Sequence, residues 1–264
     1  ALVQLLTINK FFINLYFINR GPIFFDRISE KESLKIIKFL FSKYHKISKL
    51  KLLRFNPNLE INSNNVFINQ NKKLIFFKEP FWQSSLIDLN NEISIIRENF
   101  TGSIKNDLNF FNKKKNEVGI NVYENLKNPI PENKLNHIKN LYLADQKKKN
   151  FTGINLKLIE NIINRANYKI YEVFHQETGK TIAVALFYLH YPSATYLLGI
   201  LEDNFKKFRP MPSILFKLIQ DLKDENYQYF DLGGIDIFKN KNVAFFKKKF
   251  SGKEYTLLGS NHLF

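Results

Sequence analysis

The sequence of 264 residues contains no cysteine. This absence excludes disulfide bonds, thiolate metal sites and cysteine nucleophiles, and it is consistent with a reducing cytoplasm. The five histidines do not supply a metal site either, because their positions show no ligand spacing: His45, His137, His175, His190 and His262. We therefore expect no metal centre.

Long hydrophobic runs are also missing, and none approaches the roughly 18 to 20 apolar residues that cross a membrane. The opening stretch "ALVQLLTINKFFINLYFI" is interrupted by Asn9 and Lys10, and no small-residue cleavage site follows it. It predicts neither a membrane span nor a signal peptide. Because the chain begins at Ala1 inside what reads as a strand, we expect that a segment of the first lobe is missing.

Acidic residues are few relative to basic ones. The sequence has 24 Asp and Glu against 40 Lys and Arg, which gives a formal net charge of +16. Such an excess favours polyanionic partners, which include nucleic acids, anionic membranes and nucleotide-linked substrates. An AT-rich genome would also enrich Lys, Asn, Ile and Phe codons, so part of the excess has this simpler explanation.

Proline is scarce, yet Pro129 and Pro131 stand close together near the middle of the chain. They indicate a linker between two lobes, which we place at residues 1–125 and 126–251. We expect residues 252–264 to return to the first lobe as a strand. In the second half, helices at 132–147 and 155–166 precede three strands, and a helix at 212–226 leads to a final strand.

This order is that of GNAT-type acyltransferases, and it predicts an α/β (α+β) fold of two GNAT-like lobes with mixed, largely antiparallel sheets. Glycine is absent from residues 200–232, where a coenzyme A-binding GNAT enzyme has a glycine-rich turn around the pyrophosphate. Lys206, Lys207 and Arg209 occupy this junction instead. The junction suits a phosphate ligand at a helix N-terminus, although an exposed loop explains the same residues equally well.

The stretch "FDLGGIDIFKNKNVAFFKKKFSGKEY", residues 230–255, combines a Gly-Gly turn, two aromatic residues and a run of lysines. Gly233 and Gly234 are typical of a turn that another backbone or a substrate approaches closely. Asp231 precedes them, and we interpret it as a strand end and turn residue rather than as a proton acceptor. From spacing alone, the lysine run is more typical of a solvated surface than of a site.

Several stretches resemble the Fem family of peptidoglycan-bridge aminoacyltransferases: "WQSSLIDLN", "ATYLLGI", "YFDLGGI" and the signature Phe-Lys-x-x-Phe-Gly, here Phe246, Lys247 and Phe250 with Gly252 one place late. The resemblance covers nearly the whole chain and is closest to the compact, FemX-like form. It implies that an amino acid is moved from aminoacyl-tRNA to the amine of a cell-wall precursor's stem peptide. Lys105 stands where the family usually has an arginine-rich helix start.

The implied reaction needs few catalytic groups, because the ester that joins an amino acid to tRNA is already activated. A positioned amine, a cation near the developing oxyanion and a route for the amine's proton are sufficient, without a cofactor or a protein nucleophile. We expect Lys247 to supply the cation and Phe246 to position it. The expected substrate-binding residues are Lys105, Lys206, Lys207, Arg209, Asp231, Gly233, Gly234, Lys248 and Lys249.

Three alternative hypotheses fit the same sequence. One is a GNAT-type N-acyltransferase that uses acyl-coenzyme A, another is transfer to a different amine acceptor, and the third is a basic tRNA-binding module without catalysis. For the main hypothesis, the expected partners are aminoacyl-tRNA and a nucleotide- or lipid-linked muramyl peptide. We also expect a cytoplasmic monomer with peripheral contact to the inner face of an anionic membrane.

Overall fold

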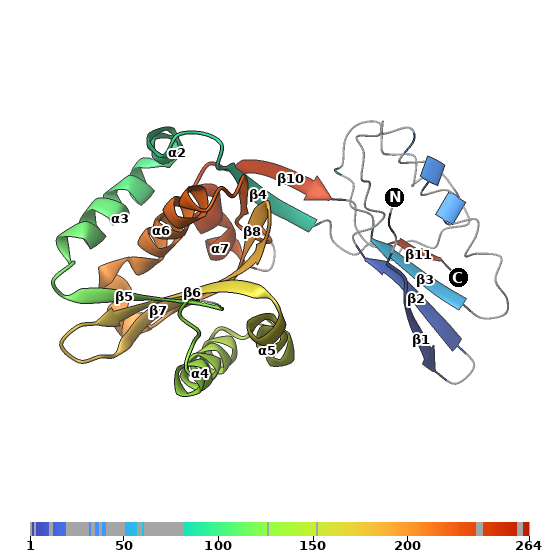
Figure 1. Ribbon diagram of the computed structural model, residues 1–264, viewed down its shortest axis with the longest axis horizontal. Helices are drawn as coiled ribbons and strands as arrows, with labels where there is room; N and C mark the ends of the chain where they lie inside the picture. The colour runs from blue at the N-terminus through green and yellow to red at the C-terminus, as the bar shows by residue number, and fades with distance from the viewer. Residues whose placement is uncertain are drawn as a thin grey trace. The chain divides into compact units, whose positions relative to one another are not determined.

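The computed structural model describes residues 2, 4–10, 13–19, 32, 35–36, 39–40, 51–56, 60, 82–125, 127–151, 153–235, 240–257 and 261–263. The chain forms two compact units. One contains Ala1–Gln83 together with Tyr255–Phe264, and the other contains Ser84–Glu254 (Figure 1).

The first unit contains a four-stranded sheet in the order β1-β2-β3-β11. β1 (Leu6–Lys10) pairs antiparallel with β2 (Ile13–Asn19), which pairs parallel with β3 (Lys51–Asn56). β11 (Asn261–Leu263) pairs antiparallel with β3. The end of the chain therefore joins the sheet of the first unit through β11.

The second unit is built on a seven-stranded sheet in the order β10-β4-β9-β8-β7-β6-β5. β8 and β9 run parallel, whereas the pairs β4–β9, β5–β6, β6–β7 and β7–β8 run antiparallel. The expected α/β class with a mixed, largely antiparallel sheet is confirmed. The strands are β4 (Trp82–Asp88), β5 (Val118–Glu124), β6 (Asn167–His175), β7 (Thr181–His190), β8 (Ser193–Leu201), β9 (Tyr229–Asp231) and β10 (Lys253–Leu257).

Helices cover both faces of this sheet (Figure 1). α2 (Ile93–Asn99), α3 (Gly102–Lys113) and α6 (Pro210–Asp224) pack on one face, and α4 (Glu132–Lys149) and α5 (Leu156–Arg165) pack on the other. β7 lies between the two layers, and almost all of its residues are buried. Its sequence "TIAVALFYLH" accordingly reads as a continuous apolar run rather than as an alternation.

α6 forms the crossover that two neighbouring parallel strands require, here between β8 and β9. Pro210 and Pro212 lie in its first turn, where the missing backbone N–H has no helical partner to lose. A short 3-10 helix, η2 (Asp203–Phe208), precedes α6, and α7 (Lys241–Lys248) follows β9. Among the described residues, no helix combines the length and the apolar character needed to cross a membrane.

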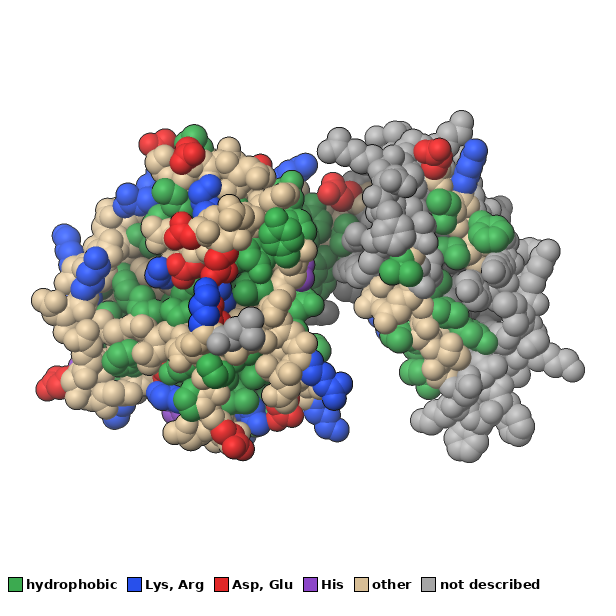
Figure 2. Space-filling view, in the orientation of Figure 1, with side chains coloured by type: hydrophobic (Ala, Val, Ile, Leu, Met, Phe, Trp, Pro, Cys, Tyr) green, Lys and Arg blue, Asp and Glu red, His purple; other side chains and the backbone are tan. Residues whose placement is uncertain are grey.

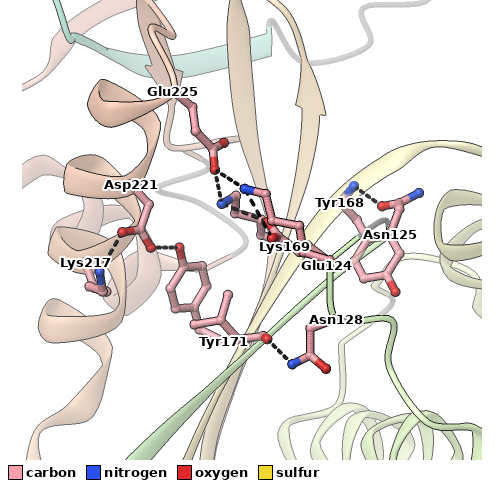
Figure 3. Close-up of polar contacts among 11 residues, drawn as sticks. Glu124, Asn125, Asn128, Tyr168, Lys169, Tyr171, Lys217, Asp221 and Glu225 are labelled. Atoms are coloured by element: carbon pink, nitrogen blue, oxygen red, sulfur yellow. Dashed lines mark hydrogen bonds and ion pairs between the residues drawn. The ribbon is translucent and has the colours of Figure 1, made fainter.

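A polar cluster joins the end of α6 to β5 and β6 (Figure 3). Lys169 of β6 is 4% exposed, and its Nζ lies 2.6 Å from Glu225 Oε1 and 3.0 Å from Glu124 Oε2. Burial alone would lower the pKa of Lys169, but hydrogen bonds to the two carboxylates outweigh it and raise the pKa. Tyr171 donates to Asp221 of α6 beside this cluster. These contacts fix the end of the helix that leads into β9.

The boundary between the two units lies between Gln83 and Ser84, whereas we expected it between residues 125 and 126. β4 pairs with β9, and α2 and α3 contribute to the same hydrophobic core as α6. β5 pairs with β6 along its whole length. Residues 84–125 therefore belong to the compact second unit, which extends to residue 254, and Pro129 and Pro131 lie inside it between β5 and α4.

Candidate active site

Lys247 lies on the buried side of α7, and 7% of its surface is exposed. The helix begins after Asn240, whose side chain accepts a hydrogen bond from Val243 N at 3.4 Å, as is typical of an N-cap residue. The Nζ atom of Lys247 donates to the carbonyl oxygen of Gly234 at 2.9 Å. The helix thus directs a lysine ammonium onto the Gly-Gly turn that follows β9.

The turn has a conformation that only glycine adopts easily at this place. Gly233 has a φ of +73°, and a Cβ atom there would lie 2.5 Å from the carbonyl oxygen of Tyr196. Asp231 Oδ1 accepts a hydrogen bond from Gly233 N at 2.8 Å and another from the buried Ser84 Oγ. In this arrangement Asp231 holds the turn, which agrees with its interpretation as a strand end.

Tyr196 of β8 completes the surroundings of the ammonium. The Nζ atom of Lys247 lies 5.3 Å from the centre of the Tyr196 ring, within the range of a cation–π interaction. A Cβ atom at Gly199 would overlap the Tyr196 hydroxyl, so the glycine provides space for it. Burial raises the pKa of Tyr196, which keeps its hydroxyl protonated. The pairing of β8 with β9 ends next to this tyrosine, at Thr195 and Asp231.

The electrostatic state of Lys247 follows from these contacts. Burial lowers its pKa from 10.5 to about 8, and the negative charge of Asp231 opposes this change only in part. An ammonium has three N–H donors, and one of them is bonded to Gly234. For the other two donors the described residues offer no hydrogen-bond acceptor. Lys247 is therefore mostly charged at neutral pH, and the described residues engage one of its three donors.

For Phe246, which we expected to position the ammonium, the described contacts are to other residues. Its side chain packs against the hydrophobic core, and its ring lies 5.4 Å from that of Phe250. Consecutive helical residues point about 100° apart, so Phe246 and Lys247 face different neighbours. The aromatic ring that the ammonium faces belongs to Tyr196. No local motif marks Tyr196, because the contact joins residues that are 51 positions apart and depends on the β8–β9 pairing.

The other two lysines of the run lie outside this group. Lys248 forms an ion pair with Glu254 at 2.8 Å. Lys249 is exposed, and its carbonyl oxygen accepts a hydrogen bond from Thr101 N at 3.0 Å. The three consecutive lysines thus differ in environment, because a helix turns each one toward a different side.

The cations before α6 form a separate group. β8 ends at Leu201, five residues after Tyr196, which corresponds to a distance on the order of 15 Å along a strand. The three cations follow this end of the strand in the chain. Lys206 pairs with Asp203 at 2.6 Å, and Arg209 pairs with Asp107 at 3.0 Å. Lys207 Nζ lies 5.2 Å from the ring centre of Phe208.

Lys105, the residue expected near the precursor, belongs to α3 and donates to the carbonyl oxygen of Glu98 at 2.8 Å. The structure therefore brings together Lys247, Gly233, Gly234 and Asp231, and it does not bring Lys105, Lys206, Lys207 or Arg209 to them. Figure 2 shows Lys and Arg side chains spread over several elements of the second unit, interspersed with acidic and apolar side chains.

A cavity of about 710 Å³ lies between α2, α3, β5 and α6. Its lining combines apolar residues with three cations, Arg97, Lys115 and Lys217, and contains no carboxylate. None of its lining residues belongs to the group around Lys247.

Comparison with known proteins identifies the family of this chain. The model of the FemAB family matches residues 94–263. The chain belongs to the FemAB family. Among curated proteins, none matches the chain.

Solved structures with this fold include the crystal structure of FemX, which aligns with a TM-score of 0.73 at 13% identity over 98% of this chain and 83% of FemX. The C-terminal domain of a putative lysylphosphatidylglycerol synthetase from Agrobacterium fabrum aligns with a TM-score of 0.59 at 12% identity, over 98% and 80% of the two chains. A tandem GNAT protein from the clavulanic acid biosynthesis pathway aligns with a TM-score of 0.50 at 6% identity, over 94% and 74%.

At these identities the structural likeness concerns the fold alone. The expected resemblance to the Fem family in its FemX-like form is confirmed by the family match and by the FemX structure. Family and fold together support a transferase, and in general terms a peptidoglycan-bridge aminoacyltransferase.

Proposed function

We propose that this FemAB-family protein transfers an amino acid from aminoacyl-tRNA to the amine of a peptidoglycan precursor's stem peptide. The observation that supports the proposal is the buried ammonium of Lys247, placed where the β8–β9 pairing ends. A fixed cation in a site of low water content attracts developing negative charge more strongly than the same cation in bulk water.

In the proposed reaction, the nitrogen of the acceptor amine forms a bond to the carbonyl carbon of the aminoacyl ester. The tetrahedral intermediate carries an oxyanion, which the ammonium of Lys247 stabilises. The bond from that carbon to the ribose oxygen of the tRNA then breaks, and a peptide bond remains. The attacking nitrogen loses one proton and the leaving oxygen gains one, so the protons balance.

The pKa of Lys247, lowered to about 8 by burial, fits both parts of this reaction. At neutral pH the side chain is mostly the charged form that stabilises an oxyanion. A pKa near the working pH also makes an efficient general acid, so Lys247 can supply the proton that the leaving oxygen takes up. The attacking amine then restores that proton.

The proposal also covers the residue that contacts the aminoacyl-tRNA and the molecule that accepts the amino acid. Lys249 is exposed and has no carboxylate partner among the described residues, so it is better suited to a tRNA phosphate than Lys206 or Arg209, which are paired with Asp203 and Asp107. We propose a nucleotide- or lipid-linked muramyl peptide as the acceptor. The protein would act in the cytoplasm as a monomer, at the inner membrane face if the acceptor is lipid-linked.

The test is single-turnover transfer with saturating aminoacyl-tRNA, which separates the chemical step from binding. Lys247→Ala is expected to slow transfer by about 10²- to 10³-fold, the usual loss for one oxyanion donor. Its affinity for aminoacyl-tRNA should change little, because Lys249 still neutralises phosphate. Lys249→Ala is the matched control and should show the opposite pattern, with weaker binding and nearly normal turnover.

Two results would contradict the proposal. One is a Lys247→Ala variant that transfers at the normal rate. The other is a wild-type protein that transfers an acyl group from acyl-coenzyme A but none from any aminoacyl-tRNA.

A further inference from the structure

α7 turns the two adjacent phenylalanines of the motif to different sides. Phe246 packs into the core, whereas 47% of the Phe245 surface is exposed. Exposure of a single hydrophobic side chain is common on protein surfaces, so its neighbours on the helix decide whether it marks a site.

Phe245 lies between two lysines on one face of the helix. Lys241, Phe245 and Lys249 are spaced by four residues each, and we call them the α7 stripe. The Nζ atom of Lys241 lies 5.7 Å from the centre of the Phe245 ring. Within the described part of the chain, neither lysine of the stripe has a carboxylate partner, whereas the neighbouring Lys248 is paired with Glu254.

Proteins that bind single-stranded nucleic acid without sequence preference combine exposed aromatic rings with nearby cations. Bases stack on the ring whatever their identity, and the cations contact the backbone phosphates. A membrane surface would also attract lysines, but α7 has eight residues, and helices that lie in a membrane interface usually offer a much larger apolar face. The stripe therefore fits unpaired nucleotides better than it fits a lipid surface.

We propose that Phe245 stacks an unpaired base near the 3′ end of the donor tRNA, while Lys241 and Lys249 contact the phosphates on either side. This inference rests on the proposed function, because it assumes an RNA-linked donor. It also places the base within the strand. Successive helical residues turn by about 100°, so Phe245 and Lys247 lie on nearly opposite sides of a helix about 10 Å wide. The stacked base therefore belongs to a nucleotide that precedes the terminal one, whose ester reaches Lys247.

The test is equilibrium binding of the full chain to a short single-stranded RNA that ends in CCA and carries a hydrolysis-resistant aminoacyl amide at its 3′ end. Fluorescence anisotropy at one fixed salt concentration gives the dissociation constant. Phe245→Ala and Phe245→Leu are expected to weaken binding by about 5- to 150-fold, the range for loss of one stacked base. Phe245→Trp should bind at least as tightly as the wild type, because it preserves the stacking surface.

Two controls separate stacking from general effects. Tyr191 is an aromatic residue that is 68% exposed and lies outside α7, so Tyr191→Ala should leave the affinity unchanged. An RNA with an abasic site at the stacked position should bind wild type and Phe245→Ala equally. A scan of abasic sites along the unpaired strand then identifies the stacked nucleotide.

The inference is overturned if Phe245→Ala and Phe245→Leu bind the RNA as tightly as the wild type. It is also overturned if Phe245→Ala lowers binding to phosphatidylglycerol vesicles and leaves RNA binding unchanged. Its failure is distinguishable from failure of the proposed function. A wild type that transfers normally while Phe245→Ala binds normally contradicts only the stacking, whereas stacking without any transfer contradicts only the proposed activity.

Discussion

At the scale of single residues, two buried lysines among the described residues of the second unit have opposite electrostatics. Lys169 lies between the carboxylates of Glu124 and Glu225, and its pKa is raised. Lys247 has a neutral carbonyl oxygen as its hydrogen-bond acceptor, and its pKa is lowered to about 8. The first arrangement is that of a structural ion pair. The second leaves a charge incompletely compensated, which is common where a group performs chemistry.

The pH dependence of stability tests this difference. The folded pKa of Lys247 is about 8 and its unfolded value 10.5, so the unfolded chain binds more protons between these values. Stability contributed by this residue therefore rises as the pH increases through 8 toward 10.5, and the cost of burying the charge is fully present below 8. Lys247→Met removes that cost.

We expect Lys247→Met to be more stable than the wild type at pH 7, by an amount on the order of 3 kcal/mol at most. The advantage should shrink as the pH approaches 10. Urea unfolding of both proteins at a series of pH values measures it, and the difference between them cancels the contribution of the tyrosines. Lys249→Met, which alters an exposed lysine, is the control and should differ from the wild type by a constant amount. A constant difference for Lys247→Met as well would argue against a buried charge.

At the scale of elements, the turn between β9 and α7 sets the position of the ammonium. Gly233 and Gly179 both have positive φ, at +73° and +65°, but they differ in their surroundings. A Cβ atom at Gly179 would meet nothing within 4 Å, whereas at Gly233 it would lie 2.5 Å from Tyr196 O. A comparison of alanine substitutions at Gly179 and Gly233 therefore separates the cost of a positive φ from the cost of the close contact with Tyr196 O.

We expect Gly179→Ala to destabilise the protein by about 1–2 kcal/mol, the cost of a left-handed conformation, with normal transfer. Gly233→Ala should cost more, because the turn has to move away from β8. It should also slow transfer, because Gly234 O then no longer fixes the ammonium. Thermal unfolding and single-turnover transfer measure the two effects. Equal destabilisation by the two substitutions would show that the contact with Tyr196 is unimportant.

Local patterns predicted many elements of the second half, because strand and helix periodicity is a local property. The helix expected at 212–226 is α6 (Pro210–Asp224), and the helix expected at 132–147 lies within α4 (Glu132–Lys149). The pairing of β4 with β9 was not predictable in this way, because the two strands are more than 140 residues apart. For the same reason the sequence indicated Lys247 but not Tyr196. It also predicted that Phe246 positions the ammonium, whereas in the helix Phe246 packs against the core and Phe245 is exposed.

At the scale of the whole molecule, the net charge of +16 does not show which lysines are available to a ligand. Lys139 pairs with Glu160 at 2.7 Å and Lys217 with Asp221 at 2.6 Å, so both already have acidic partners. Lys241 and Lys249 lack such partners among the described residues. This distribution means that total charge governs long-range attraction to a polyanion, while a few unpaired lysines govern where it binds.

The salt dependence of tRNA binding tests whether individual lysines, rather than the total charge alone, determine where the polyanion binds. Binding should weaken steeply as the salt concentration rises from about 50 to 200 mM, because each neutralised phosphate releases counterions. Lys249→Ala should reduce the slope of log affinity against log salt by about 1, the value for one phosphate contact. Lys139→Ala removes the same charge from an existing ion pair, so it should leave the slope unchanged. Fluorescence anisotropy with labelled tRNA measures all three proteins. If the two variants change the slope equally, net charge alone drives binding, and the α7 stripe has no special part in it.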